Sequence, residues 1–144
     1  MSETVLPTEM NTVADNYGYP TNIVFVREPS YTHKLNLDSQ TVSDFVDNKE
    51  AYRQAVVKLL STERYDHIIY TTNYGVELRS LFGMSIYYVV PELVRRITEA
   101  VMQDDRTTDV YGFDFDTTKK GVVSVKFHAS SIYGDVEIEK EVEI

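Results

Sequence analysis

The side chains that could bind a metal or carry out acid–base chemistry are few and scattered. The three histidines are His33, His67 and His128, and none is paired with another histidine or a carboxylate at HxH or HExxH spacing. Ligands from distant positions can still converge on a metal, but histidines of strands and loops are the simpler interpretation. The chain has no cysteine, which excludes disulfides, thiolate zinc sites and cysteine nucleophiles. We therefore predict no metal and no cofactor.

One carboxylate pair deserves consideration as a glycoside hydrolase site. Such enzymes need two carboxylic acids, one of which is kept neutral by burial. Glu63 precedes an aromatic and apolar segment, with Asp66 nearby, but Glu63 is equally typical of a helix end where it pairs with Arg64 or caps the backbone. The chain has 23 acidic residues, so a single pair has little weight. No GxGxxG, GxxxxGK[ST] or GxSxG motif is present, and we predict no catalytic residues.

Length, charge and hydropathy narrow the class of protein. A chain of 144 residues suits one domain, and we expect an extended or flexible arm at 1–22 followed by a single domain at 23–144. The net charge of −9 and the absence of a dense Lys/Arg cluster disfavour nucleic acid as a partner. The N-terminus lacks the pattern of a secretory signal, and the longest apolar stretch, 84–91, is too short to cross a bilayer. The sequence predicts a soluble protein without a membrane partner.

Apolar residues at helical spacing predict two main helices. The first begins at Asp47 or Asn48, either of which can act as the N-cap, and ends near 61–64. The second places Pro91 in its first turn and continues to about Gln103. Between them the sequence predicts a brief strand at 67–70 and a short helix at 76–82.

The last forty residues change to a period of two. Three strands are expected near 110–115, 123–129 and 136–144, separated by polar turns, and they predict a three-stranded antiparallel meander with one face toward the helices. Short strands are expected near 31–37 and 42–46, with another at 23–27. The predicted fold class is α+β: a C-terminal three-stranded antiparallel sheet packed on two main helices, with additional short N-terminal strands that add to it.

Three features of the sequence favour assembly with other proteins. Asp104 and Asp105, followed by Arg106, stand at the C-terminal end of a helix, where the helix dipole disfavours carboxylates. Either a partner compensates them, or Arg106 offsets them in solvent. Glutamates alternate along the last strand, which either prevents self-association or meets a basic partner. The chain also has eleven tyrosines, a residue type enriched at interfaces.

The order of several motifs resembles the baseplate wedge family of contractile tails, over roughly residues 30 to 144. The chain is most similar to the short proteins of Gram-positive phages and defective prophages. The motifs that carry the resemblance are Ala51–Ala55 (AYRQA), Leu59–Tyr65 (LLSTERY), Asn73–Leu78 (NYGVEL), Ile97–Ala100 followed by Gln103–Arg106, and Ile132–Asp135 (IYGD).

The resemblance implies a structural role in a baseplate, close to the tube. It implies contacts with larger wedge proteins and with the tail sheath subunit, on which the first sheath ring assembles, and tube or hub proteins are further candidates. Family members carry Glu-Pro-Arg at the end of the long helix to grip the wedge core, and the matching positions here are Asp104, Asp105 and Arg106. The proline is missing, so the local backbone should differ. The lysozyme-like label sometimes given to the family has little support in these residues.

Further expectations concern the sheath, the copy number and the location. The predicted sheath-binding residues belong to the last strand, which would pair with an incoming strand: Val136, Ile138, Lys140, Val142 and Ile144. The sixfold symmetry of such baseplates implies six copies, in a phage or phage-tail-like particle assembled in the host bacterial cytoplasm. The alternatives are a cell-wall glycoside hydrolase carried by the tail and a small binding module unrelated to tails.

Overall fold

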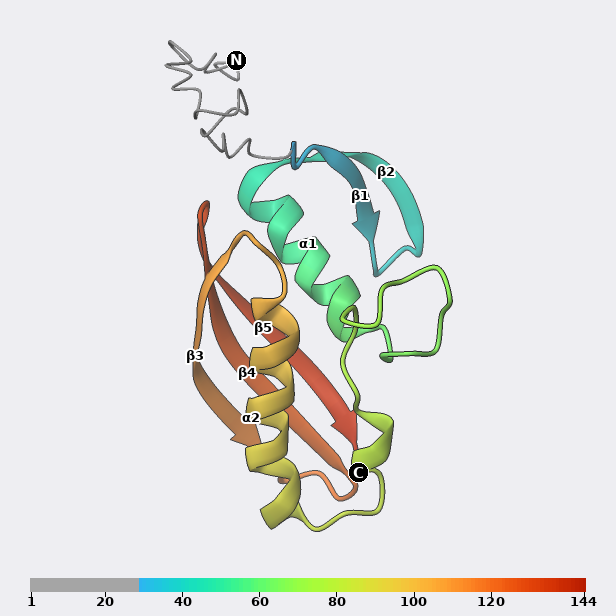
Figure 1. Cartoon of the computed structure of the whole chain (residues 1–144), viewed down its shortest axis with the longest axis vertical. Helices are drawn as coiled ribbons and strands as arrows, with labels where there is room; N and C mark the ends of the chain where they lie inside the picture. The colour runs from blue at the N-terminus through green and yellow to red at the C-terminus, as the bar shows by residue number, and fades with distance from the viewer. Residues whose placement is uncertain (1–28) are drawn as a thin grey trace, which may run out of the picture.

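The computed structural model describes residues 29–144, and the arm expected at 1–22 and the strand expected at 23–27 lie outside the described residues. Two helices cover one face of a C-terminal sheet, and a separate hairpin lies at the N-terminal end of the first helix (Figure 1). The elements in chain order are β1 (Thr32–Asn36), β2 (Thr41–Val46), α1 (Asn48–Leu60), the 3-10 helix η1 (Arg79–Leu81), α2 (Ile86–Met102), β3 (Thr107–Asp116), β4 (Val122–Ser131) and β5 (Gly134–Glu143). The α+β prediction is confirmed.

The C-terminal meander forms as the alternation predicts. The strands are antiparallel in the order β3-β4-β5, and β4 pairs with β5 without interruption from Val122 opposite Glu143 to Ser131 opposite Gly134. The inward residues of β4 are fully buried: Val123, Val125, Phe127 and Ala129. Burial of this face against the helices fixes the register, because a shift by one residue would turn every apolar side chain to water.

The β3 edge of the sheet is irregular. Its pairing with β4 shifts register between Tyr111 and Asp114, and Gly112 within this interval has a φ of +69°. This is a β-bulge, in which a residue with positive φ bends the strand. A Cβ at Gly112 would lie 2.9 Å from the His128 ring. Glycine is therefore favoured there both by the positive φ and by the close approach of this ring.

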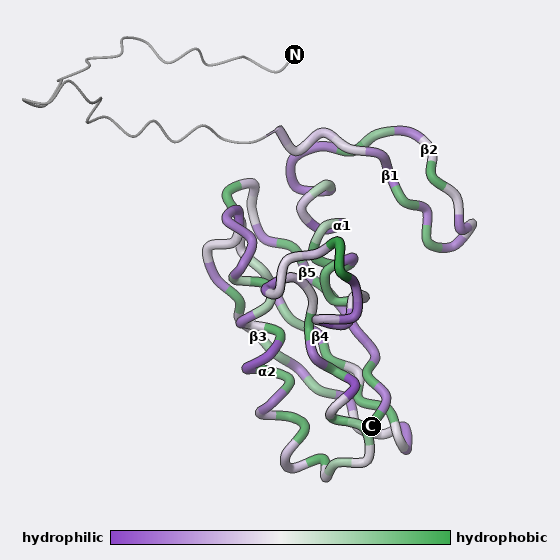
Figure 2. Tube along the Cα trace, turned by 45° about the vertical axis from the view of Figure 1, so that its right-hand side comes forward, coloured by the Kyte–Doolittle hydropathy of each residue, from purple (hydrophilic) through white to green (hydrophobic). Residues whose placement is uncertain are grey.

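Both helices form where their apolar stripes predict, but α2 begins earlier than expected. Asp47 caps α1, its side chain accepting a hydrogen bond from the Asn48 amide at 2.7 Å. Helix α2 begins at Ile86, so Pro91 lies inside the helix rather than in its first turn. The reason is burial, because Val89 is fully buried and extends the apolar stripe of the helix toward its N-terminus. Pro91 has no amide hydrogen, so the Tyr87 carbonyl loses its helical hydrogen bond. Tyr87 is 90% exposed. Hydrophobic and hydrophilic residues alternate along α2 in Figure 2.

Two predictions between the helices are wrong. Residues 67–70 form a turn rather than a strand, closed by the Tyr70 amide donating to the His67 carbonyl at 3.2 Å. The helix expected at 76–82 is only the three-residue η1, because the Glu63 carboxylate takes the amides of Leu78 and Arg79 and starts the helical turn there. In the second case a side chain from outside the segment decides the local structure, and hydrophobic periodicity does not report such a contact.

The N-terminal strands do not extend the C-terminal sheet, contrary to expectation. β1 and β2 form a sheet of their own. Its attachment is to α1, where the Gln54 side chain accepts from the Leu35 amide at 2.9 Å and donates to the His33 carbonyl at 2.8 Å. A two-stranded hairpin is marginally stable alone, so α1 positions it.

Candidate interaction surfaces

The predicted wedge-binding cluster is a turn held together by an internal ion pair. Arg106 donates from Nε and Nη2 to the two oxygens of Asp104, at 2.9 and 2.6 Å, and its backbone amide donates to the same carboxylate at 2.9 Å. Burial alone would raise the pKa of the Asp104 carboxyl, but these hydrogen bonds from Arg106 hold it below its ordinary value. The acid at the helix end is thus compensated within the chain, while Asp105 is exposed.

This turn is also fixed to the rest of the core. The Arg106 guanidinium lies 5.6 Å from the centre of the Tyr52 ring, and the Tyr52 hydroxyl is hydrogen-bonded to the Thr107 hydroxyl at 2.7 Å. The Arg106 carbonyl accepts from the Ile132 amide, which lies in the turn between β4 and β5. The cluster therefore joins α1, the end of α2 and the C-terminal sheet in one rigid arrangement.

Two adjoining grooves lie beside the cluster. The larger has a volume of about 400 Å³ and lies between the first described residues and α1. The smaller has a volume of about 280 Å³. Leu59, Tyr74 and Asp104 line both, and Arg106 lines only the larger. Tyr74 is distant from Asp104 and Arg106 in the sequence, and the fold brings it beside them.

The residues predicted to bind the sheath by main-chain pairing lie on β5 and directly after it, and most of their side chains are turned into the core. Val136, Ile138 and Val142 are buried, and Lys140 and Ile144 are half-buried on the same face. Among the described residues, the only backbone hydrogen bonds of β5 join it to β4. What β5 offers a partner is therefore its outer main-chain edge and its exposed glutamates.

The carboxylates considered for hydrolysis have structural partners. Glu63 accepts the amides of Leu78 and Arg79 at 3.1 Å each, and Asp66 is ion-paired with Arg79 at 2.6 Å. The hydrogen bond from Arg79 lowers the pKa of Asp66. Hydrolysis needs one carboxyl kept neutral by a raised pKa, and this arrangement stabilises the ionised Asp66 instead.

Each of the three histidine rings packs against an aromatic ring of the same or a neighbouring element. His33 packs on Phe45, His67 meets the edge of Tyr70, and His128 stacks on Tyr111. Across residues 29–144, no three His, Asp or Glu side chains gather in a way that could hold a metal ion. No helix in the same range is long and apolar enough to cross a membrane.

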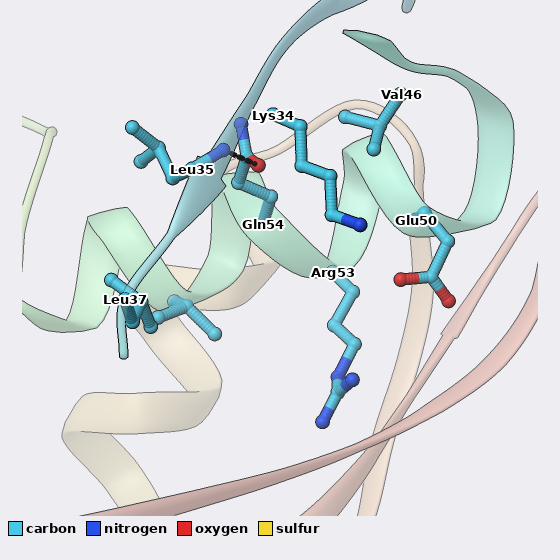
Figure 3. A pocket seen from close by; sticks show the side chains of 8 residues that line it. Lys34, Leu35, Leu37, Val46, Glu50, Arg53 and Gln54 are labelled. Atoms are coloured by element: carbon cyan, nitrogen blue, oxygen red, sulfur yellow. Dashed lines mark hydrogen bonds between the residues drawn. The ribbon is translucent and has the colours of Figure 1, made fainter. Parts of the chain in front are cut away.

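A further hollow, of about 270 Å³, lies between the β1–β2 hairpin and α1 and was not predicted from the sequence. In Figure 3 the Arg53 and Glu50 side chains extend from α1, and a hydrogen bond joins Gln54 to Leu35. The sequence also gave no indication that Ile68 and Ile69 would be exposed, because their β-branched side chains favoured a paired strand.

The chain belongs to the family of contractile injection system sheath initiators, whose match spans residues 28–134. The prediction of a structural baseplate subunit of a contractile tail or injection particle is confirmed.

Among individual proteins, the phage-like element PBSX protein XkdS of Bacillus subtilis (strain 168) is 34% identical over 120 residues, covering 80% of this chain and 84% of the relative. A chain of the cryo-EM structure of the anti-feeding prophage (AFP) baseplate, 6-fold symmetrised, has a TM-score of 0.47 and 18% identity to this chain. That similarity covers 80% of this chain and 86% of the other.

Proposed function

We propose that this protein binds the larger wedge proteins of its baseplate and nucleates the sheath, without catalysing a reaction. The observation that carries the proposal is the asymmetry of the C-terminal sheet. β5 is a regular ten-residue edge strand whose only backbone hydrogen bonds within residues 29–144 run to β4. Such an edge is suited to accept a strand from another chain.

The sheath contact is main-chain pairing along β5. The inward side chains of β5 are fixed in the core, so a partner strand meets a rigid row of backbone donors and acceptors. Lys140 on the inward face and the exposed glutamates discourage pairing between identical copies. The acidic row favours a sheath strand that carries basic residues.

The wedge contact is the Asp104–Arg106 cluster and its grooves. Two of the three guanidinium nitrogens of Arg106 are held by Asp104, and no hydrogen bond within residues 29–144 uses the third, Nη1. The guanidinium is therefore oriented before binding, which lowers the entropy lost on association. A wedge carboxylate or carbonyl could accept from Nη1.

The remaining parts of the proposal are supported only by the resemblance to the baseplate wedge family. Residues 23–144 act as one wedge domain with an N-terminal arm, present in six copies per baseplate and close to tube or hub proteins. Assembly takes place in the host bacterial cytoplasm.

The sheath contact is tested by hydrogen exchange. We expect amides of 134–143 to gain protection when the purified sheath subunit is added, while amides of the opposite edge strand β3 do not. Unchanged exchange in β5 despite measurable binding would contradict strand addition.

The wedge contact is tested by co-purification with the wedge proteins encoded beside this chain. Arg106→Ala should lose the complex, and Arg106→Lys should weaken it, because an ammonium group cannot reproduce the planar fork. Arg95→Ala is the matched control, since Arg95 is an exposed arginine ion-paired on the surface of α2. Thermal melting of each variant separates lost binding from lost folding. Normal binding by a folded Arg106→Ala variant would contradict this contact.

A further inference from the structure

The segment after α1 exposes two adjacent isoleucines to solvent. Ile68 and Ile69 are 103% and 86% exposed, and they lie in a loop, Tyr65–Tyr70, whose two terminal tyrosines are also exposed. In Figure 1 this green segment projects away from both helices after the end of α1. Isolated exposed apolar residues are ordinary, whereas contiguous ones mark interaction sites.

The Tyr65–Tyr70 loop is braced from both sides. At its start, Asp66 accepts two hydrogen bonds from the Arg79 guanidinium, at 3.2 and 2.6 Å. At its end, the Tyr70 ring stacks on Tyr74 with a centroid separation of 4.5 Å. The isoleucines are therefore presented by a fixed loop, and docking them on a partner costs little conformational entropy.

The base of the loop is fixed as well. The Arg64 amide donates to the Val76 carbonyl and its side chain to the Gly75 carbonyl and to Glu99. None of these hydrogen bonds involves Ile68 or Ile69, so they fix the loop and leave both isoleucine side chains uncovered.

We propose that the Tyr65–Tyr70 loop is an apolar anchor that inserts Ile68 and Ile69 into an apolar socket on a larger wedge protein. This inference rests on the proposed function and adds a second point of contact to it. The loop leads directly into the groove of the Asp104–Arg106 cluster, because Thr71, Asn73 and Tyr74 line the smaller groove beside Asp104. An apolar anchor next to a polar, charge-bearing groove is the usual arrangement of a protein interface.

The charges around the loop favour a protein rather than a lipid surface. Segments that insert into anionic membranes carry flanking lysines or arginines. Here Asp66 within the loop neutralises Arg79, Glu63 precedes the loop, and the whole chain has a net charge of −9.

The test is binding of the larger wedge proteins by an Ile68→Ser, Ile69→Ser double variant of the full chain. We expect an affinity loss of about tenfold or more, as for paired anchor residues, with an unchanged melting temperature because neither side chain is buried. Leu37→Ser is the matched control: Leu37 is 70% exposed in the β1–β2 turn, and its replacement should leave wedge binding unchanged. Protection of β5 by the sheath subunit should also be unchanged in the double variant.

The possible contrary results are distinct. Wild-type affinity in the double variant would overturn the anchor and leave the proposed function standing, whereas no wedge binding by the wild type would overturn both. If the wild type floated with phosphatidylglycerol vesicles and the double variant did not, the loop would bind a membrane and the proposed wedge anchor would be wrong. If the wild type sedimented as an oligomer and the double variant as a monomer, the loop would bind a second copy of this chain and the proposed wedge anchor would be wrong.

Discussion

At the scale of single residues, the core depends on one buried polar pair. The Tyr52 and Thr107 hydroxyls are hydrogen-bonded at 2.7 Å, and Tyr52 is fully buried. Burial raises the pKa of the Tyr52 hydroxyl above its ordinary value, and either hydroxyl of the pair could be the donor. The pair links α1 to the first residue of β3, directly after the Asp104–Arg106 cluster.

Removing both partners of this pair should cost less than the two single losses added together. We expect Tyr52→Phe to lower the free energy of unfolding by about 1–2 kcal/mol, because the Thr107 hydroxyl loses its partner in the core. The double variant Tyr52→Phe, Thr107→Val should lose less than the sum of the two single variants. Urea denaturation of the four proteins measures this, and strict additivity would show that the bond contributes nothing.

Glycine at position 75 is required by space as well as by backbone conformation. Gly75 has a φ of +96°, and a Cβ there would lie 2.7 Å from the Thr62 carbonyl oxygen. Gly83 has a φ of +78° with nothing within 4 Å of the added atom, which makes it the matched control. We expect Gly83→Ala to cost about 1 kcal/mol of unfolding free energy from backbone strain. Gly75→Ala should cost about 1–3 kcal/mol more from overpacking, and equal losses in denaturation would contradict this.

At the scale of elements, sequence periodicity predicts those stabilised by an apolar face. The fully buried row of β4 and the stripes of α1 and α2 were each predictable, because burial imposes the period that the sequence displays. The segment 61–82 was not predictable in this way. Its conformation depends on single long-range bonds, such as those from Glu63 to the amides of Leu78 and Arg79, and such bonds leave no periodic signal.

The residues of the candidate sites also differ in whether the sequence could predict them. Asp104 and Arg106 were identified through family resemblance, and the structure brings them together, whereas Tyr74 and the exposed isoleucines depend on how distant segments meet. The β5 residues were predicted to bind the sheath through main-chain pairing, which stays a prediction. The same alternation that defined the strand requires the side chains of Val136, Ile138 and Val142 to fill the core.

Helix α2 contains a testable defect at Pro91. The proline leaves the Tyr87 carbonyl without its helical hydrogen bond. We expect Pro91→Ala to raise the free energy of unfolding by about 1–2 kcal/mol, the restored bond outweighing the greater entropy of the unfolded chain. Arg53→Ala, on the exposed side of α1, should change it by less than about 0.5 kcal/mol. A destabilised Pro91→Ala protein in chemical denaturation would mean that the ring packs favourably.

At the scale of the whole molecule, acidic groups set the dependence of stability on pH. Hydrogen bonds from Arg95 and Arg96 lower the pKa of Glu92 to about 2 from an ordinary value of 4.5. A hydrogen bond from Arg79 likewise lowers the pKa of Asp66. Hydrogen bonds from neutral groups, the Thr118 backbone amide and the Ser130 hydroxyl, lower the pKa values of Asp116 and Asp135. A carboxyl with a lowered pKa in the folded state stabilises the protein above its unfolded pKa and loses that contribution as pH falls through the folded value.

Stability should therefore be full above about pH 4.5 and should decline toward pH 2. Glu92→Gln should show a shallower decline over this window, since it lacks the group with the largest shift. Added salt should reduce the difference between the two proteins, because Arg95, one of the two arginines bound to Glu92, is exposed and its attraction is screened. Parallel pH profiles of urea midpoints for wild type and Glu92→Gln would contradict the assignment.

The unequal edges of the C-terminal sheet also determine how the free protein can associate with itself. Endless stacking into fibrils needs two compatible edges per molecule, so that each added copy leaves a fresh one. Here the bulge at Gly112 interrupts the β3 edge, and only β5 is regular. If two copies paired through β5, neither would have a regular edge left for a third copy, and association would stop at the dimer. Their like-charged glutamate rows would also oppose each other. We therefore expect that the free subunit does not polymerise through this sheet and that its one regular edge remains available for a different chain.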